Sequence, residues 1–90
     1  MNEDWRNLKV GDMIRIVQLP TEISDAPPGY RLPAETQQLY RRLQILGTPL
    51  RVFEIDSNGV PWIKCSFGGS DIHFLAINDN SWTRIDNRNQ

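Results

Sequence analysis

The clearest pattern in the chain is the alternation of apolar and polar residues on both sides of Ser57-Asn58-Gly59. In the second run, Ile63, Cys65 and Phe67 fall on one face of an extended strand. Asn-Gly between two such runs is typical of a type I′ turn, because glycine adopts a positive φ without steric cost. The pattern therefore predicts a tight β-hairpin over Leu50 to Phe67, around which the rest of the chain is organised.

Three shorter segments also have strand patterns. Met13 to Leu19 carries apolar residues on both faces, which predicts a strand covered on both sides. Ile72 to Ile77 alternates, and Trp82 to Ile85 is long enough for a short last strand. Between these two, Asn78 to Ser81 is expected to form a single helical turn, in which Asn and Asp side chains satisfy local backbone donors.

Pro33 to Leu46 has the pattern of an amphipathic helix. Leu39, Leu43 and Leu46 recur at helical spacing, and Tyr40 widens their apolar stripe. Gly47 suits the left-handed residue that ends a helix. A helix of this length is only marginally stable in isolation, so we expect its leucine face to pack on the sheet.

A proline-rich loop from Pro20 to Leu32 precedes this helix. Proline lacks the N–H that a strand ladder needs, so the segment is expected to be irregular or polyproline-like. Long loops are often functional or mobile. The alternative is an ordered loop that covers the core with Ile23, Tyr30 and Leu32.

The composition is that of one small domain. Ninety residues with 39% hydrophobic content are enough for a single compact core, which we place at about residues 5–86. Together the patterns predict a mainly β fold, a small β-barrel of about five strands with one helix inserted between the first strand and the central hairpin. The net charge of −1 gives no bulk attraction to nucleic acid or anionic lipid. The polar acidic start and the lack of a long apolar run predict a cytoplasmic protein, which we expect to be a monomer.

Four segments resemble those of SH3-like barrels. They are the entry Val10-Gly11-Asp12, the long loop after the first strand, the hairpin from Asp56 to Val60, and the closing stretch from Ala76 to Ile85. The helix that ends in Arg41-Arg42-Leu43-x-x-Leu46-Gly47 and leads into a strand is similar to FeoA-type domains, which are SH3-like partners of bacterial iron transporters and repressors. The resemblance implies a small bacterial interaction protein. The chain departs from SH3 domains that bind Pro-rich peptides, since it has neither their Ala-Leu-Tyr-Asp-Tyr-like opening strand nor their acidic loop.

No set of residues predicts catalysis or a cofactor. His73 is the only histidine, and a metal site made with Asp71 or Cys65 lacks the spaced ligand pair of zinc motifs. Gly68-Gly69 is not followed by the Lys-Ser/Thr and helix of a phosphate-binding loop. The single cysteine excludes an internal disulfide and is expected to be a buried apolar residue. We therefore expect a protein that is not an enzyme and holds no cofactor or metal.

Aromatic residues are the leading candidates for a protein or peptide contact. In the SH3-like arrangement, a Trp early in the strand after the hairpin and an aromatic before the last strand border the ligand groove, and Trp62 and Trp82 match those places. Tyr30 of the loop is expected to complete the surface, because exposed aromatics bury large area at small entropic cost. Alternatively Trp62 packs under the proline-rich loop, or Pro27-Pro28-Gly29-Tyr30 itself occupies the groove.

A second hypothesis, from a different class, is binding of RNA or another nucleic acid. It uses a basic patch interleaved with aromatic residues, made of Arg41, Arg42, Arg51, Lys64 and Arg84. Acidic residues are interspersed among these cations in the sequence, which weakens the patch. The two hypotheses differ in salt dependence, since only a basic-patch binder loses affinity steeply with added salt.

Overall fold

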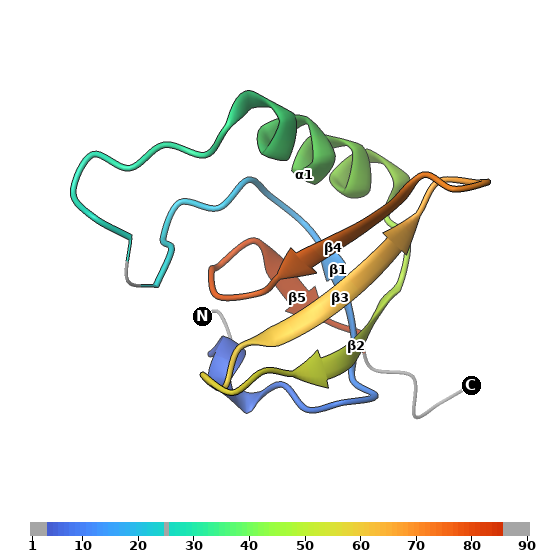
Figure 1. Ribbon diagram of the computed structural model, residues 1–90, viewed down its shortest axis with the longest axis horizontal. Coiled ribbons are helices and arrows are strands. Elements are labelled where there is room, and N and C mark those ends of the chain that lie inside the picture. The colour runs from blue at the N-terminus through green and yellow to red at the C-terminus, as the bar shows by residue number, and fades with distance from the viewer. Residues whose placement is uncertain (1–3, 25, 86–90) are drawn as a thin grey trace.

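Five antiparallel strands and one α-helix form the computed structural model, which describes residues 4–24 and 26–85 (Figure 1). The strand order in the sheet is β4-β3-β2-β1-β5. In chain order the elements are the 3-10 helix η1 (Trp5–Asn7), β1 (Met13–Ile16), α1 (Ala34–Leu46), β2 (Leu50–Ile55), β3 (Pro61–Ser66), β4 (Ile72–Ala76) and β5 (Trp82–Arg84). The predicted mainly β fold with a helix between the first strand and the central hairpin is confirmed. The sheet is open, with β4 and β5 at its edges, and residue 86 of the predicted core lies outside the described residues.

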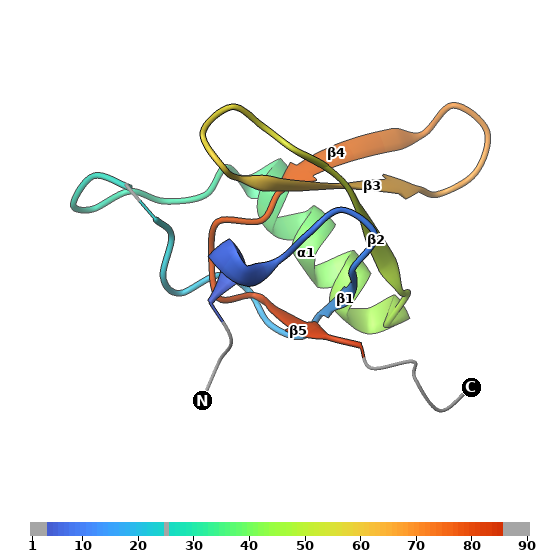
Figure 2. The ribbon, with the colours of Figure 1, turned by 90° about the horizontal axis from the view of Figure 1, so that it is seen from below.

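Strand β2 joins two layers of the sheet. Figure 2 shows β3 and β4 on one side of the molecule and β1 and β5 on the other, with β2 running between them. The register between β2 and β3 shifts between Val52 and Glu54. Such a bulge bends a strand and increases its twist, which lets β2 pair with both layers. In Figure 1, α1 covers the side of the molecule opposite β2.

The core fills the space between the two layers and α1. It consists of Leu8, Ile14, Ile16, Tyr40, Leu43, Leu50, Val52, Ile63, Cys65, Leu75, Ile77 and Trp82. Ile63 and Cys65 are buried and Phe67 packs against them, so the predicted inner face of β3 is confirmed. Burial raises the pKa of the Cys65 thiol, which keeps it protonated as a small apolar side chain.

The helix forms where its pattern predicted, but its buried face differs. Gly47 ends it at φ 62°, and its N–H donates to the Leu43 carbonyl at 2.9 Å. Tyr40 and Leu43 are buried, whereas Leu46 is 55% exposed. Leu46 lies on the last turn and lines a surface groove with Phe67 rather than the core, so the predicted leucine face is wrong at this end.

The central hairpin is present, but its turn is not the predicted two-residue type I′ turn. The Asp56 N–H donates to the Val60 carbonyl at 3.0 Å, and the Gly59 N–H donates to the Asp56 carbonyl at 2.9 Å. The loop therefore contains three residues, with Gly59 at φ 81°. A turn followed by a left-handed residue is the usual form of a three-residue hairpin loop.

Two other local predictions are wrong. Strand β1 ends at Ile16, and Arg15 on its outer face is exposed, so β1 is covered on one side only. The expected helical turn over residues 78–81 is absent, and Asp79 instead forms an isolated β-bridge with Ile23 of the loop. The Asn80 side chain accepts the N–H groups of Thr21 and Glu22, which holds the start of the loop against this connection. Asp79 Oδ1 still accepts the local N–H of Ser81 at 2.9 Å, as predicted, whereas the Asn80 side chain bonds to residues distant in the sequence.

Candidate functional site

The outer face of β2, β3 and β4 carries exposed apolar side chains. We call Phe53, Trp62, Ile72 and Phe74 the aromatic sheet face. Phe53, Ile72 and Phe74 are 41%, 42% and 57% exposed, and Trp62 is half-buried. The rings of Phe53 and Phe74 contact each other, with centroids 5.8 Å apart and an interplanar angle of 58°. A tilted aromatic pair of this kind is stabilised by more than the burial of its apolar surface area alone.

The strand registers place these residues on one face. Leu75 pairs with Ile63, and both are buried, so the residues next to them in β3 and β4 point outward. Phe74 pairs with Lys64 on that outward side. Phe53 joins them beside the bulge in β2. The alternation within Ile72 to Ile77 already separated Phe74 from Leu75, but no sequence signal showed which side faces the core.

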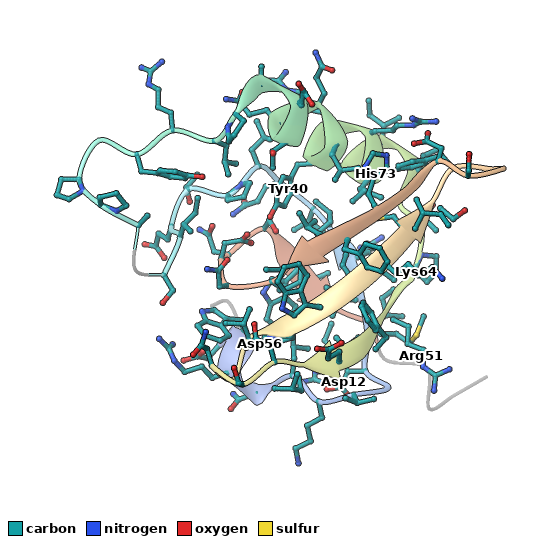
Figure 3. All side chains as sticks on the ribbon, in the orientation of Figure 1. Asp12, Tyr40, Arg51, Asp56, Lys64 and His73 are labelled. Carbon is teal, nitrogen blue, oxygen red and sulfur yellow. The ribbon has the colours of Figure 1, made fainter. Side chains whose placement is uncertain are left out.

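Charged residues border the aromatic sheet face. Lys64 and Arg51 are both exposed, and Figure 3 shows them on the same side of the molecule. No ion pair of either is present among the residues that the structure describes. Glu54 lies directly opposite Trp62 in the β2–β3 register. The face is thus apolar at its centre, with charges of both signs around it.

The Trp62 ring is held by the hairpin turn. Its indole Nε1 donates to Asp56 Oδ2 at 2.9 Å, and the other carboxylate oxygen accepts the N–H groups of Asn58 and Val60. The hydrogen bond from Trp62, followed by those from the backbone, lowers the pKa of Asp56. Trp62 is therefore oriented by an ionised aspartate rather than by the proline-rich loop.

This arrangement predicts a pH dependence of stability. The pKa of Asp56 is lower in the folded chain than in the unfolded one, so its carboxylate stabilises the fold above the ordinary aspartate pKa of about 3.9. That contribution is lost as the pH falls through the lowered value. We expect the melting temperature of the wild type to exceed that of Asp56→Asn at pH 7, and the difference to shrink at acidic pH. Melting followed by circular dichroism at a series of pH values tests this, and a constant difference would contradict it.

Trp82 does not belong to the exposed surface that the sequence predicted. It is 3% exposed, and its Nε1 donates to the Asp79 carbonyl at 3.0 Å. Its side chain faces the core because it pairs with Ile16 of β1, whose side chain is also buried. The prediction of Trp82 as a partner-binding residue is wrong for this reason.

Tyr30 is exposed, as predicted, but it lies apart from the two tryptophans. It lines a cavity within the proline-rich loop, together with Leu19, Ile23 and Leu32. Neither Trp62 nor Trp82 lines that cavity. Pro27 and Pro28 are exposed, so the loop does not fill a groove over Trp62. The structure therefore does not bring the three predicted contact residues together.

The five predicted nucleic-acid contacts lie on three parts of the fold. Arg41 and Arg42 lie on α1, Arg51 and Lys64 lie on the sheet, and Arg84 lies on β5. Arg42 forms an ion pair with Asp71 at 3.8 Å. Arg84 forms an ion pair with Asp12 at 2.7 Å. Burial acts to raise the pKa of Asp12, but hydrogen bonds from Arg84 and the Lys9 N–H outweigh it and hold the pKa low.

His73 belongs to a surface cluster rather than a metal centre. Its Nε2 lies 2.8 Å from Asp71 Oδ1, and its ring contacts Phe67 with centroids 5.6 Å apart. Cys65 pairs with His73 across the strands, but its buried thiol is a poor ligand while protonated. In residues 4–24 and 26–85 there is no group of three potential metal ligands.

Comparison with known proteins does not extend this description. No family model, curated protein or solved structure matches the chain. Within the part of the chain that the structure describes, no helix is long and apolar enough to cross a membrane. The functional conclusion therefore rests on the chain's own side chains.

Proposed function

We propose that the chain is a non-catalytic protein-interaction module with SH3-like barrel architecture, and that the aromatic sheet face contacts its partner. The observation that carries the proposal is the exposed, mutually stacked pair of Phe53 and Phe74. The two-layered antiparallel sheet supports the SH3-like assignment. Of the three contact residues predicted from the sequence, the proposed contact surface includes Trp62 and leaves out Trp82 and Tyr30.

The energetics favour an apolar partner surface. Burial of apolar area yields about 25 cal/mol per Å², and buried aromatic anchors dominate many protein interfaces. Phe53 and Phe74 already restrict each other, and the hydrogen bond to Asp56 orients Trp62. Little side-chain entropy is therefore lost when a partner covers them.

The charge distribution favours a protein over a nucleic acid. The net charge of the chain is −1, and the cations Arg42 and Arg84 are paired with carboxylates. Lys64 and Arg51 remain beside the aromatic sheet face, but Glu54 stands among them. Nucleic-acid binding relies on many phosphate contacts, which two cations beside a carboxylate do not supply.

Selection from a phage library of random peptides of about ten residues tests the proposal. The tightest peptide recovered is expected to bind Phe74→Ala about 10- to 30-fold more weakly than wild type, as measured by calorimetry. Ile45→Ala is the matched control, because Ile45 is 84% exposed on α1, outside the aromatic sheet face. Both variants are expected to melt close to wild type, because both side chains are largely exposed.

Two results would overturn this function. One is equal affinity of the selected peptide for wild type, Phe53→Ala and Phe74→Ala. The other is a lack of any selected peptide combined with binding of single-stranded RNA that falls steeply with salt, which would favour the nucleic-acid hypothesis.

A further inference from the structure

We propose that the free edge of β4 receives an extended segment of the partner as an added antiparallel strand, in the groove between β4 and α1. This inference rests on the proposed interaction function and specifies how the partner binds. It differs from recognition of a polyproline helix, because backbone hydrogen bonds to an edge strand contribute the affinity.

The two edges of the sheet differ in protection. Natural edge strands are usually shortened, charged, bulged or interrupted by proline, which prevents unwanted pairing. At one edge, β5 has three residues and carries Arg84, which is paired with Asp12. At the other edge, β4 has the sequence Ile-His-Phe-Leu-Ala, with no proline, lysine or carboxylate, and it pairs with β3 in unbroken register. The β4 edge is thus longer than the β5 edge, regular, and without these features in its own sequence.

The hydrogen bonds of β4 show which backbone groups face outward. The Ile77 N–H donates to the Pro61 carbonyl, and the Phe67 N–H donates to the Asp71 carbonyl. Hydrogen-bonded and non-hydrogen-bonded residue pairs alternate along an antiparallel ladder. The backbone groups of the odd-numbered residues of β4 are therefore hydrogen-bonded to β3. The N–H and C=O groups of Phe74 and Ala76 therefore point away from β3. A peptide strand placed there forms its hydrogen-bonded pair at Phe74, which is also part of the aromatic sheet face.

A groove beside this edge accommodates the added strand. It measures about 400 Å³ and lies between Glu35, Thr36 and Leu39 of α1 and residues 72–75 of β4. Neighbouring strands lie about 4.8 Å apart, so a new strand beside β4 passes over this face of the helix. Alternate side chains of the peptide then pack on Leu39 and Thr36, and the others lie beside Phe74 and Ile72.

The charges of the groove select the occupant and its direction. Helix α1 runs antiparallel to β4, since its Arg42 pairs with Asp71 at the start of β4 and its Glu35 lines the groove near Leu75. In the described part of the chain, Glu35 has no ion pair. A peptide antiparallel to β4 places its N-terminal residues near Glu35. The preferred segment therefore has alternating apolar residues and a lysine or arginine near its N-terminal end.

A second copy of the chain fits this groove less well. In a symmetric antiparallel pairing centred on Phe74, Ile72 of the second copy lies opposite Ala76. Strand β4 contains no lysine or arginine, so a second copy brings no cation of its own β4 to Glu35. A foreign basic segment is therefore the occupant that the groove favours over another β4.

Substitution of Ala76 by proline tests the inference. Proline removes an N–H that points outward, a position where edge strands tolerate it, so the pairing with β3 is kept. With the tightest peptide of the phage selection as probe, we expect Ala76→Pro to bind at least about 10-fold more weakly than Ala76→Ser, which keeps the N–H. Hydrogen exchange by NMR is expected to show that the peptide protects the Phe74 and Ala76 amides. Thermal melts confirm that both variants fold.

The outcomes separate this inference from the proposed function. If Phe74→Ala weakens binding while Ala76→Pro and Ala76→Ser bind equally, strand addition is wrong and the interaction function stands. If Phe74→Ala and Ala76→Pro both bind the peptide as tightly as wild type, both proposals are wrong. Selected peptides rich in proline and without alternation would overturn strand addition. A wild-type dimer in ultracentrifugation that Ala76→Pro abolishes would overturn the foreign segment as the occupant, because the β4 edge would then pair with a second copy.

Discussion

Replacement of Trp82 by alanine is expected to lower the free energy of unfolding by about 3–5 kcal/mol. Trp82 is 3% exposed, and its removal leaves a large cavity where β5 meets the core. The Asp79 carbonyl also loses the indole N–H that donates to it. Domains of this size are stable by only about 5–13 kcal/mol, so the loss is a large part of the total. Urea unfolding followed by circular dichroism measures it.

Trp62→Ala is the matched control for this experiment. Trp62 is half-buried on the outer face, so we expect its loss to cost only about 1 kcal/mol. The same variant is expected to weaken peptide binding, which separates a contact residue from a core residue. Equal destabilisation by the two substitutions would contradict the placement of Trp82 in the core and Trp62 at the surface.

The second large effect is expected at Asp79, which connects α1 to the sheet. Its carboxylate is 6% exposed and accepts the Tyr40 hydroxyl at 2.7 Å and the Ser81 N–H at 2.9 Å. Asp79→Ala leaves both donors buried without an acceptor, at a cost of about 1–3 kcal/mol each. Burial, followed by the nearby Asp79 charge, raises the pKa of Tyr40 well above its ordinary value, so the hydroxyl remains a donor at neutral pH.

A double-mutant cycle isolates the Tyr40–Asp79 contribution. Tyr40→Phe removes only the hydroxyl and keeps the ring that packs in the core. We expect the double variant Tyr40→Phe with Asp79→Ala to be more stable, by about 1 kcal/mol or more, than the sum of the single losses predicts. Additive losses would show that the hydrogen bond carries no coupling energy.

The regular elements were predictable from the sequence because their signals are local. Alternation located β3 and β4, and the inward side of β3 followed from Ile63 and Cys65. The helix boundaries followed from Pro33 and from Gly47, whose left-handed conformation is confirmed. These features depend on residues a few positions apart, which a sequence shows directly.

The site was harder to predict because it depends on which side of each strand faces inward. A strand of three residues such as β5 has too little periodicity to show that Trp82 points into the core. Phe53 lies beside a bulge, where the alternation of faces breaks, so its outward position needed the register. The hydrogen bonds of Asn80 to Thr21 and Glu22 join residues almost sixty positions apart, and no local pattern indicates them.

The way in which the proline-rich loop is fastened has a consequence for engineering. Asn80 holds its first residues, and the Gln37 side chain donates to the Leu32 carbonyl at its end. Between these two anchors, Pro28 and Gly29 are exposed and belong to no strand or helix. Foreign sequence grafted between them would enlarge a segment whose ends are already fixed, at a small entropic cost for each added residue. The chain thus offers a display position on an element that contributes no residue to the aromatic sheet face.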